Sequence, residues 1–230
     1  MKIDKFLFLF FLIILIFSCK KDEPFKQLTY PSVYYKSGIK IAGDLRVFST
    51  SGEIKDPSIT SRFLATDSLS YSYGADQIGN NPGTMDSIKF SDAQHAIVKE
   101  GYSQYNCAVD QENKELILTR ADTSARLIYN EQFTHSITYN IRQVKPEVYS
   151  EYLVSSTRGD YIFGYTGKEK YVLQESNGQL VAPEILFMQH HLLVYYNGRA
   201  NNILQNDFYK NIPTGDTVSI QGYLLLYEKQ

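Results

Sequence analysis

Histidine is the side chain most often used for metal binding and proton transfer, and the chain has four of them. His190 and His191 are adjacent, so in a strand they point to opposite faces and cannot both bind one metal. His95 and His135 are far from them in sequence, and no cysteine and histidine spacing typical of a zinc site occurs. We therefore expect no metal site and no cofactor, and we interpret the histidines as structural.

The sequence contains no motif of a known catalytic site. The G-x-S-x-G, H-E-x-x-H, P-loop, EF-hand and C-x-x-C patterns are all missing. Two pairs of acidic residues, Glu53 with Asp56 and Asp110 with Glu112, lie beside predicted turns, where carboxylates are ordinarily solvated. Carboxylates that are remote in sequence can still meet in the fold, as in glycosidases, so a hydrolase is kept as an alternative. The pattern predicts a protein without enzymatic activity.

Tyrosine is the most abundant aromatic residue, with 19 copies, and tryptophan is absent. A tyrosine ring packs against other side chains while its hydroxyl reaches water or a ligand, which suits pleated, half-exposed surfaces. Four pairs of tyrosines are candidate platforms for a glycan or peptide, although packing is the more common role of any one tyrosine. The candidate ligand-binding residues are Tyr34, Tyr35, Tyr71, Tyr73, Tyr102, Tyr105, Tyr195 and Tyr196.

The two cysteines, Cys19 and Cys107, have different surroundings. Cys19 follows two lysines, Lys2 and Lys5, and an apolar run over residues 6–17. That run of about twelve residues is too short for a transmembrane helix, which needs roughly 20, and is typical of the apolar part of a signal peptide. Cys107 lies in a predicted strand, where a lone cysteine is usually a small buried hydrophobic residue.

The residues Ile16, Ser18 and Cys19 resemble the lipobox of bacterial lipoproteins, and Lys-Lys-Asp-Glu at 20–23 resembles the export tract of Bacteroidota surface lipoproteins. The resemblance implies cleavage between Ser18 and Cys19, a diacylglycerol on the Cys19 sulfur, and a third, amide-linked chain of the palmitate type. Two or more acyl chains hold a protein stably on a membrane, since each buried methylene contributes about 0.8 kcal/mol. We expect localisation at the outer membrane, facing the cell exterior, with the periplasmic face as the alternative.

Most of the remaining chain shows the alternation of apolar and polar residues that predicts strands. Ile39, Ile41 and Val47 belong to one predicted strand over 39–47, with a bulge or a close approach of another backbone at Gly43. Short strands recur with turn signals between them and with few helical segments. This pattern predicts an all-β fold, either an antiparallel β-sandwich or a closed β-barrel of about ten to twelve strands with one or two short helices.

Several segments need separate interpretation. An Asp-Pro pair favours a helix over 57–65, and residues 201–211 are expected to include one helical turn. Residues 126–133 and 136–144 are predicted to form a hairpin of two strands. Residues 184–197 are apolar on both faces, so a helix or a central strand is possible, and the aromatic residues favour the strand.

We divide the chain into a signal peptide (1–18), a lipidated cysteine with a tether (19–36) and a single β-rich domain (37–230). A formal net charge of −2 without clustered lysine and arginine argues against a nucleic-acid partner. We expect an outer-membrane-anchored binding or envelope-assembly domain whose partner is a glycan, a peptide or an outer-membrane protein. The alternatives are a secreted or surface hydrolase of the glycosidase type and an accessory subunit of an outer-membrane transporter.

Overall fold

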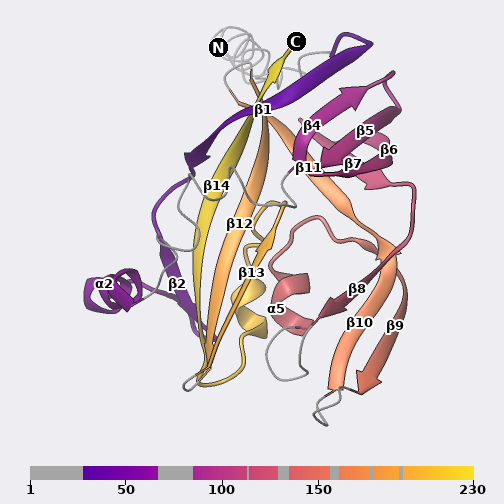
Figure 1. Cartoon of the computed structure of the whole chain (residues 1–230). Helices are drawn as coiled ribbons and strands as arrows, with labels where there is room; N and C mark the ends of the chain where they lie inside the picture. Colours follow the sequence, from indigo (N-terminus) through magenta and orange to yellow (C-terminus); the bar gives the residue numbers. More distant parts are fainter. Residues whose placement is uncertain are drawn as a thin grey trace, which may run out of the picture.

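The computed structural model describes residues 28–66, 85–112, 114–128, 135–155, 161–176, 179–191 and 194–230, most of which form β-strands (Figure 1). The strands are β1 (Ser32–Ile41), β2 (Arg46–Ser49), β3 (Gly52–Ile54), β4 (Met85–Phe90), β5 (His95–Glu100), β6 (Ser103–Glu112), β7 (Glu115–Arg120), β8 (Ser124–Ile128), β9 (Glu147–Ser155), β10 (Tyr161–Lys168), β11 (Lys170–Ser176), β12 (Gln179–His191), β13 (Val194–Ala200) and β14 (Thr217–Lys229). The helical elements are α2 (Pro57–Thr66), α5 (His135–Asn140) and the 3-10 helix η1 (Phe208–Asn211). None of these described helices is long and apolar enough to cross a membrane.

Eight strands close into an antiparallel barrel in which each strand pairs with the next barrel strand along the chain. Their order is β1, β4, β5, β6, β7, β11, β12 and β14, and the ring closes because β14 pairs with both β12 and β1. The predicted all-β fold is confirmed, and closure shows that it is a barrel rather than a sandwich. Between β7 and β11 the chain forms α5 and a separate three-stranded sheet of order β8-β10-β9.

The strands β12 and β14, with 13 residues each, continue below the barrel in the view of Figure 1. Near its start β12 pairs with β11, where Val181 lies opposite Gln174, but from Ile185 onward it pairs with β13. In the same way, β14 pairs with β2 in its first residues and with β1 in its last. The result is an open lower sheet of order β13-β12-β14-β2-β3 that is continuous with the barrel wall.

Successive side chains of β12 point to opposite faces of the sheet and belong to two separate hydrophobic clusters. Leu180, Ala182 and Leu186 point into the barrel, where they pack with core residues of the other barrel strands. Ile185 and Phe187 point to the other face and pack with residues of α5 and η1. One strand therefore joins the barrel core to the core of the lower sheet, and both of its faces are buried.

The predicted single strand over 39–47 is wrong, because β1 ends at Ile41 and β2 begins at Arg46. Gly43 has a φ of +91°, which glycine adopts without steric cost, and the turn directs the chain from the barrel to the lower sheet. The first strand also begins earlier than expected, at Ser32. Residues 32–36 therefore belong to the barrel and not to the tether.

The predicted strand over 136–144 is wrong, because α5 forms over His135–Asn140. Ile137 and Ile141 are four residues apart, the Ile141 N–H bonds to the Ile137 carbonyl, and both side chains are fully buried in the lower core. Burial of this helical pair outweighs the period of two in the local sequence. Of its proposed hairpin partner, the structure describes only residues up to Ile128, in β8, and residues 129–134 lie outside the described part.

The strand interpretation of residues 184–197 is confirmed, although they form the hairpin of β12 and β13 rather than one strand. The helix expected over 57–65 is confirmed as α2, where Asp56 Oδ1 accepts a hydrogen bond from the Ser58 N–H at 2.8 Å. The helical turn expected within 201–211 is confirmed as η1.

Candidate functional site

The barrel interior changes from apolar to charged at its lower end, where Glu184 faces inward. Alternation along β12 puts Glu184 on the same face as Ala182 and Leu186, which belong to the barrel core. Its neighbour across the β12–β14 ladder is the core residue Tyr223. Only 3% of Glu184 is exposed. A carboxyl group buried to this extent needs partners that compensate for the loss of water.

Arg199 is the ion-pair partner of Glu184 and comes from the neighbouring strand. The β12–β13 register places Arg199 opposite Leu186, and therefore on the face that also carries Glu184. Arg199 Nε lies 3.4 Å from Glu184 Oε1. The Nη1 atom of the same guanidinium is buried and has no hydrogen-bond partner among the described residues. One nitrogen of Arg199 therefore remains available for another acceptor.

A second ion pair joins the segment after α5 to the residue that precedes β11. Arg142 Nη1 donates to Glu169 Oε2 at 3.0 Å, and Tyr165 Oη donates to the other oxygen of the same carboxylate. Glu169 is 6% exposed, and a backbone bridge between Arg142 and Leu204 holds the arginine segment in place. Arg142 Nε is buried, and the part of the chain that the structure describes supplies it with no hydrogen-bond acceptor.

Tyr171 adds a third buried polar atom. It lies in β11 opposite Leu118 of β7, its ring belongs to the barrel core, and only 6% of it is exposed. Its hydroxyl interacts with the Glu100 carboxylate of β5 through a side-chain hydrogen bond. Burial raises the pKa of Tyr171, and the nearby Glu100 carboxylate raises it further. The hydroxyl therefore keeps its proton and can donate it to an acceptor.

We name these residues the lower-mouth cluster: Glu100, Arg142, Glu169, Tyr171, Glu184 and Arg199. Burial raises the pKa of Glu184 from 4.5 to about 7, Arg199 and a hydrogen bond from Asn201 oppose the rise, and Glu100 adds to it. Near neutral pH the Glu184 carboxyl group is thus divided between its protonated and ionised forms. A buried carboxyl group with this property is more frequent in functional sites than elsewhere.

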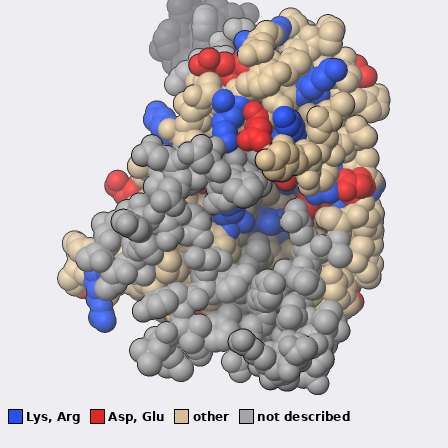
Figure 2. All heavy atoms as spheres, viewed as in Figure 1, with Lys and Arg blue, Asp and Glu red and all other residues tan. Residues whose placement is uncertain are grey.

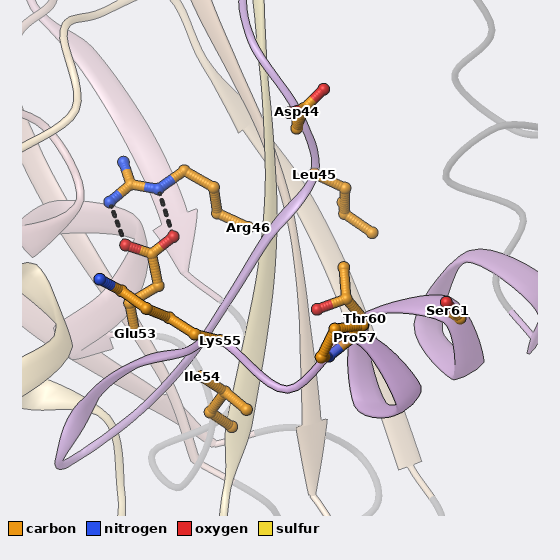
Figure 3. Close-up of a pocket in the computed structure, with 9 residues that line it drawn as sticks. All are labelled: Asp44, Leu45, Arg46, Glu53, Ile54, Lys55, Pro57, Thr60 and Ser61. Atoms are coloured by element: carbon orange, nitrogen blue, oxygen red, sulfur yellow. Dashed lines mark hydrogen bonds and ion pairs between the residues drawn. The ribbon is translucent and has the colours of Figure 1, made fainter.

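A separate surface cleft of about 510 Å³ lies between the β2–β3 hairpin and α2 (Figure 3). Arg46 points toward Glu53 there and donates two hydrogen bonds to its carboxylate, at 3.0 and 2.8 Å. These bonds lower the pKa of Glu53 and satisfy both charges within the hairpin. The described lining residues include no buried polar atom that lacks a partner. The lower-mouth cluster is therefore the stronger candidate for a site.

The predicted tyrosine platform is divided between different parts of the molecule. Tyr34 packs on the barrel core, whereas the adjacent Tyr35 points outward and is 45% exposed. Tyr105 also packs on the barrel core, with the Arg120 guanidinium 3.6 Å from its ring centroid. Tyr102 is fully exposed at the turn between β5 and β6. The structure does not bring these four rings together on one face.

The remaining predicted site residues lie largely outside the described part of the chain. This applies to Ser18, Cys19, Tyr71 and Tyr73 and to the side chains of Tyr195 and Tyr196, whose backbones belong to β13. Cys107 is described: it is 3% exposed, and burial raises the pKa of its thiol to about 12. The interpretation of Cys107 as a small buried hydrophobic residue is confirmed.

The structure describes the surroundings of two histidine side chains, His95 and His190. His95 is exposed at the start of β5 and lies 2.9 Å from an Asp92 oxygen. His190 packs edge-on against Phe63 of α2, with ring centroids 4.6 Å apart. In the part of the chain that the structure describes, no group of three or more histidine, cysteine or acidic side chains is placed to hold a metal ion. The absence of a metal stays a prediction.

The lower-mouth cluster is not evident from the sequence, because its members are spread from position 100 to position 199. One signal was present: Glu184 is the only formally charged residue in the otherwise apolar or neutral run 184–197. A carboxylate at the start of such a run is a candidate for burial, and buried carboxylates need partners.

Comparison of the chain with protein families, curated proteins and solved structures found no match.

Proposed function

We propose that the protein is a lipid-anchored binding protein of the outer membrane and that the lower-mouth cluster contacts its ligand. The observation that carries this proposal is a pair of buried guanidinium nitrogens, Arg142 Nε and Arg199 Nη1, that have no hydrogen-bond partner among the described residues. Leaving one such group unpaired costs roughly 1–3 kcal/mol. Departures of this kind from full pairing are expected at functional sites, and a ligand that accepts these hydrogen bonds recovers the free energy on binding.

The position of the first strand supports an orientation for the anchored molecule. Thr29, just before β1, accepts a hydrogen bond from Lys229 at the end of β14, so both ends of the domain meet at the upper end of the barrel (Figure 1). The 13 residues from Cys19 to Ser32 span at most about 45 Å. On this proposal the anchor is attached at the upper end of the barrel, which is the end opposite to the lower-mouth cluster.

Replacing Cys19 with alanine tests the anchor. We expect the Cys19→Ala chain to move from the membrane fraction to the soluble fraction, because the acyl chains lose their attachment atom. Cys107→Ala is the matched control, since it removes the other thiol and leaves the chain in the membrane fraction. Ultracentrifugation and immunoblotting measure the partition, and an unchanged membrane fraction for Cys19→Ala rules out the anchor.

Protease treatment of intact cells then distinguishes the exterior face, where the domain is degraded, from the periplasmic face, where it is protected until lysis.

One observation favours a second candidate function, a glycosidase-like hydrolase. Glu184, with its pKa near 7, is suited to general-acid catalysis, and it interacts electrostatically with Glu100, which comes from a distant strand. If the chain is such a hydrolase, we expect it to release nitrophenol from nitrophenyl glycosides. We then expect Glu184→Gln to lower the rate of nitrophenol release by about 100-fold or more. Binding of a sugar without any release of nitrophenol eliminates the hydrolase and leaves the binding protein.

A further inference from the structure

We infer that the outer face of strands β1, β4 and β5 lies against an anionic lipid surface. The inference rests on the proposed lipid anchor and specifies which face of the domain contacts the membrane. A tether of up to about 45 Å limits the distance between the domain and the membrane but leaves the orientation of the domain open. Orientation therefore depends on contacts that the folded domain itself makes.

The three strands are neighbours in the barrel wall, in the order β5-β4-β1 (Figure 1). Successive residues of a strand point to opposite faces, so a residue next to a core residue points outward. Lys89 lies between Ile88 and Phe90, which both belong to the barrel core. Lys99 follows the core residue Val98 in the same way. We name the outward residues of these strands the basic wall: Tyr35, Lys40, Ser87, Lys89, Ile97 and Lys99.

The lysines of the basic wall have no acidic partner in the described part of the chain. Figure 2 shows basic side chains at several places on the barrel part of the face in view, some of them beside acidic side chains. Lys36 is paired in this way, since its Nζ lies 3.3 Å from Asp86 Oδ1. Lys40, Lys89 and Lys99 are all exposed, and no described residue forms an ion pair or a hydrogen bond with any of them.

Acidic residues are scarce around the basic wall. The three strands contain only two, namely Asp86, which pairs with Lys36, and Glu100, which faces inward and interacts with Tyr171. On the adjacent strand β14, Glu228 lies opposite Tyr35 and borders the wall. Three lysines and one bordering carboxylate leave this face with a net positive charge.

Two of the lysines repel one another across the sheet. The β4–β5 register pairs Lys89 with Ile97 and Ser87 with Lys99, so the two lysines are diagonal neighbours. Diagonal neighbours lie about 7–8 Å apart, and the residues between these two are uncharged. This arrangement is unfavourable in the isolated domain and becomes favourable against a surface of negative charge.

Tyrosines lie on the basic wall and beside it, where the tether joins the barrel. Tyr35 is 45% exposed, and Tyr30, just before β1, is 38% exposed. Tyrosine is enriched at the boundary between lipid headgroups and acyl chains, because its ring is apolar and its hydroxyl is polar. The tether leads into β1 at Ser32, so an anchored domain holds these two rings close to the membrane.

The lysines are sufficient to orient a domain that is already anchored. Each lysine near an anionic lipid surface strengthens binding by about fivefold, so three lysines give a factor of about 100. A factor of this size holds a free protein only weakly. In an anchored chain the contact is intramolecular, and the same factor sets the ratio of oriented to unoriented domains.

The test uses the full lipidated chain in vesicles of phosphatidylcholine mixed with phosphatidylglycerol, an anionic lipid, and in vesicles of phosphatidylcholine alone. The chain has no tryptophan, so Tyr35→Trp introduces a single reporter into the basic wall. Lipids with brominated acyl chains quench the fluorescence of a tryptophan that contacts the membrane. We expect strong quenching of Tyr35→Trp in the anionic vesicles and little in the neutral ones. Tyr149→Trp is the matched control, because Tyr149 is 56% exposed in β9, outside the wall, and is expected to escape quenching.

Removing charge from the wall tests the role of the lysines. In the Tyr35→Trp chain, we expect Lys89→Gln combined with Lys99→Gln to lower the ratio of membrane-contacting to free domains by about 25-fold, fivefold for each lysine. Lys55→Gln is the matched control, since Lys55 is exposed after β3 in the lower sheet and its loss leaves the quenching unchanged. Unchanged quenching in the double variant, or equal quenching in neutral vesicles, overturns the inference.

Further outcomes separate this inference from the anchor. Flotation of the vesicles reports whether the chain is anchored, and a chain that floats without quenching of Tyr35→Trp overturns the inference alone. A chain that does not float overturns the anchor and the inference with it. Equal quenching of Tyr149→Trp shows that the domain has no preferred face and also overturns the inference. Loss of quenching in sodium phosphate, but not in sodium chloride of the same ionic strength, makes free phosphate the partner and rules out the lipid surface.

Discussion

Raising the pH from 5 to 8 is expected to lower the free energy of unfolding by about 2–3 kcal/mol through Glu184 alone. Burial holds the pKa of this carboxyl group at about 7 in the folded chain, against an ordinary value of 4.5. Between these two values the folded state binds more protons than the unfolded state. The contribution to stability is therefore fully present below about pH 4.5 and is lost as the pH rises through 7.

The variant Glu184→Gln isolates this effect, because glutamine has a similar shape and does not titrate. We expect urea unfolding at pH 5 and pH 8 to show a smaller loss of stability in Glu184→Gln than in the unmodified chain. Glu53→Gln is the matched control: the bonds from Arg46 lower the pKa of Glu53, so its titration lies below this pH range and the loss persists. An equally steep loss in Glu184→Gln would falsify the assignment of the titration to Glu184.

The fold class was predictable because most barrel strands bury one face and expose the other, as in β6, where Cys107 and Val109 are buried between exposed neighbours. The closure of the barrel was not predictable in the same way. It depends on β12 and β14 each exchanging one partner strand for another along their length, which is a property of the whole sheet. Because β12 is buried on both faces, its local sequence shows no alternation at all.

Local patterns also failed where distant contacts decided the structure. Ile137 of α5 and Ile141, just after the helix, fit a strand in isolation, and only packing in the core of the lower sheet selects the helical turn that buries them together. Adjacent tyrosines such as Tyr34 and Tyr35 in one strand must point to opposite faces, so this pair cannot form one flat platform.

The site was less predictable than the fold because its contacts depend on strand register. Glu184 could be suspected of burial from its apolar surroundings, but its partner could not be identified. Arg199 reaches Glu184 only because the β12–β13 hairpin sets Arg199 opposite Leu186. A shift of one residue in that register would turn Arg199 to the other face of the sheet.

Removing the hydroxyl of Tyr227 is expected to destabilise the barrel core. Tyr227 Oη donates to the Met85 carbonyl at 2.7 Å, so Tyr227→Phe removes a buried hydrogen bond and lowers the free energy of unfolding by about 1–3 kcal/mol. Tyr102→Phe is the matched control, because Tyr102 is fully exposed at the turn between β5 and β6 and its loss of a hydroxyl changes the free energy of unfolding by less than about 0.5 kcal/mol.

Urea unfolding of the two variants at one pH measures the difference. Equal stability of Tyr227→Phe and Tyr102→Phe means that the hydrogen bond to the Met85 carbonyl contributes nothing to the barrel. A loss confined to Tyr227→Phe means that this bond stabilises the closed barrel, because it joins β14 to β4, two strands that are separated by β1 in the sheet and share no backbone ladder.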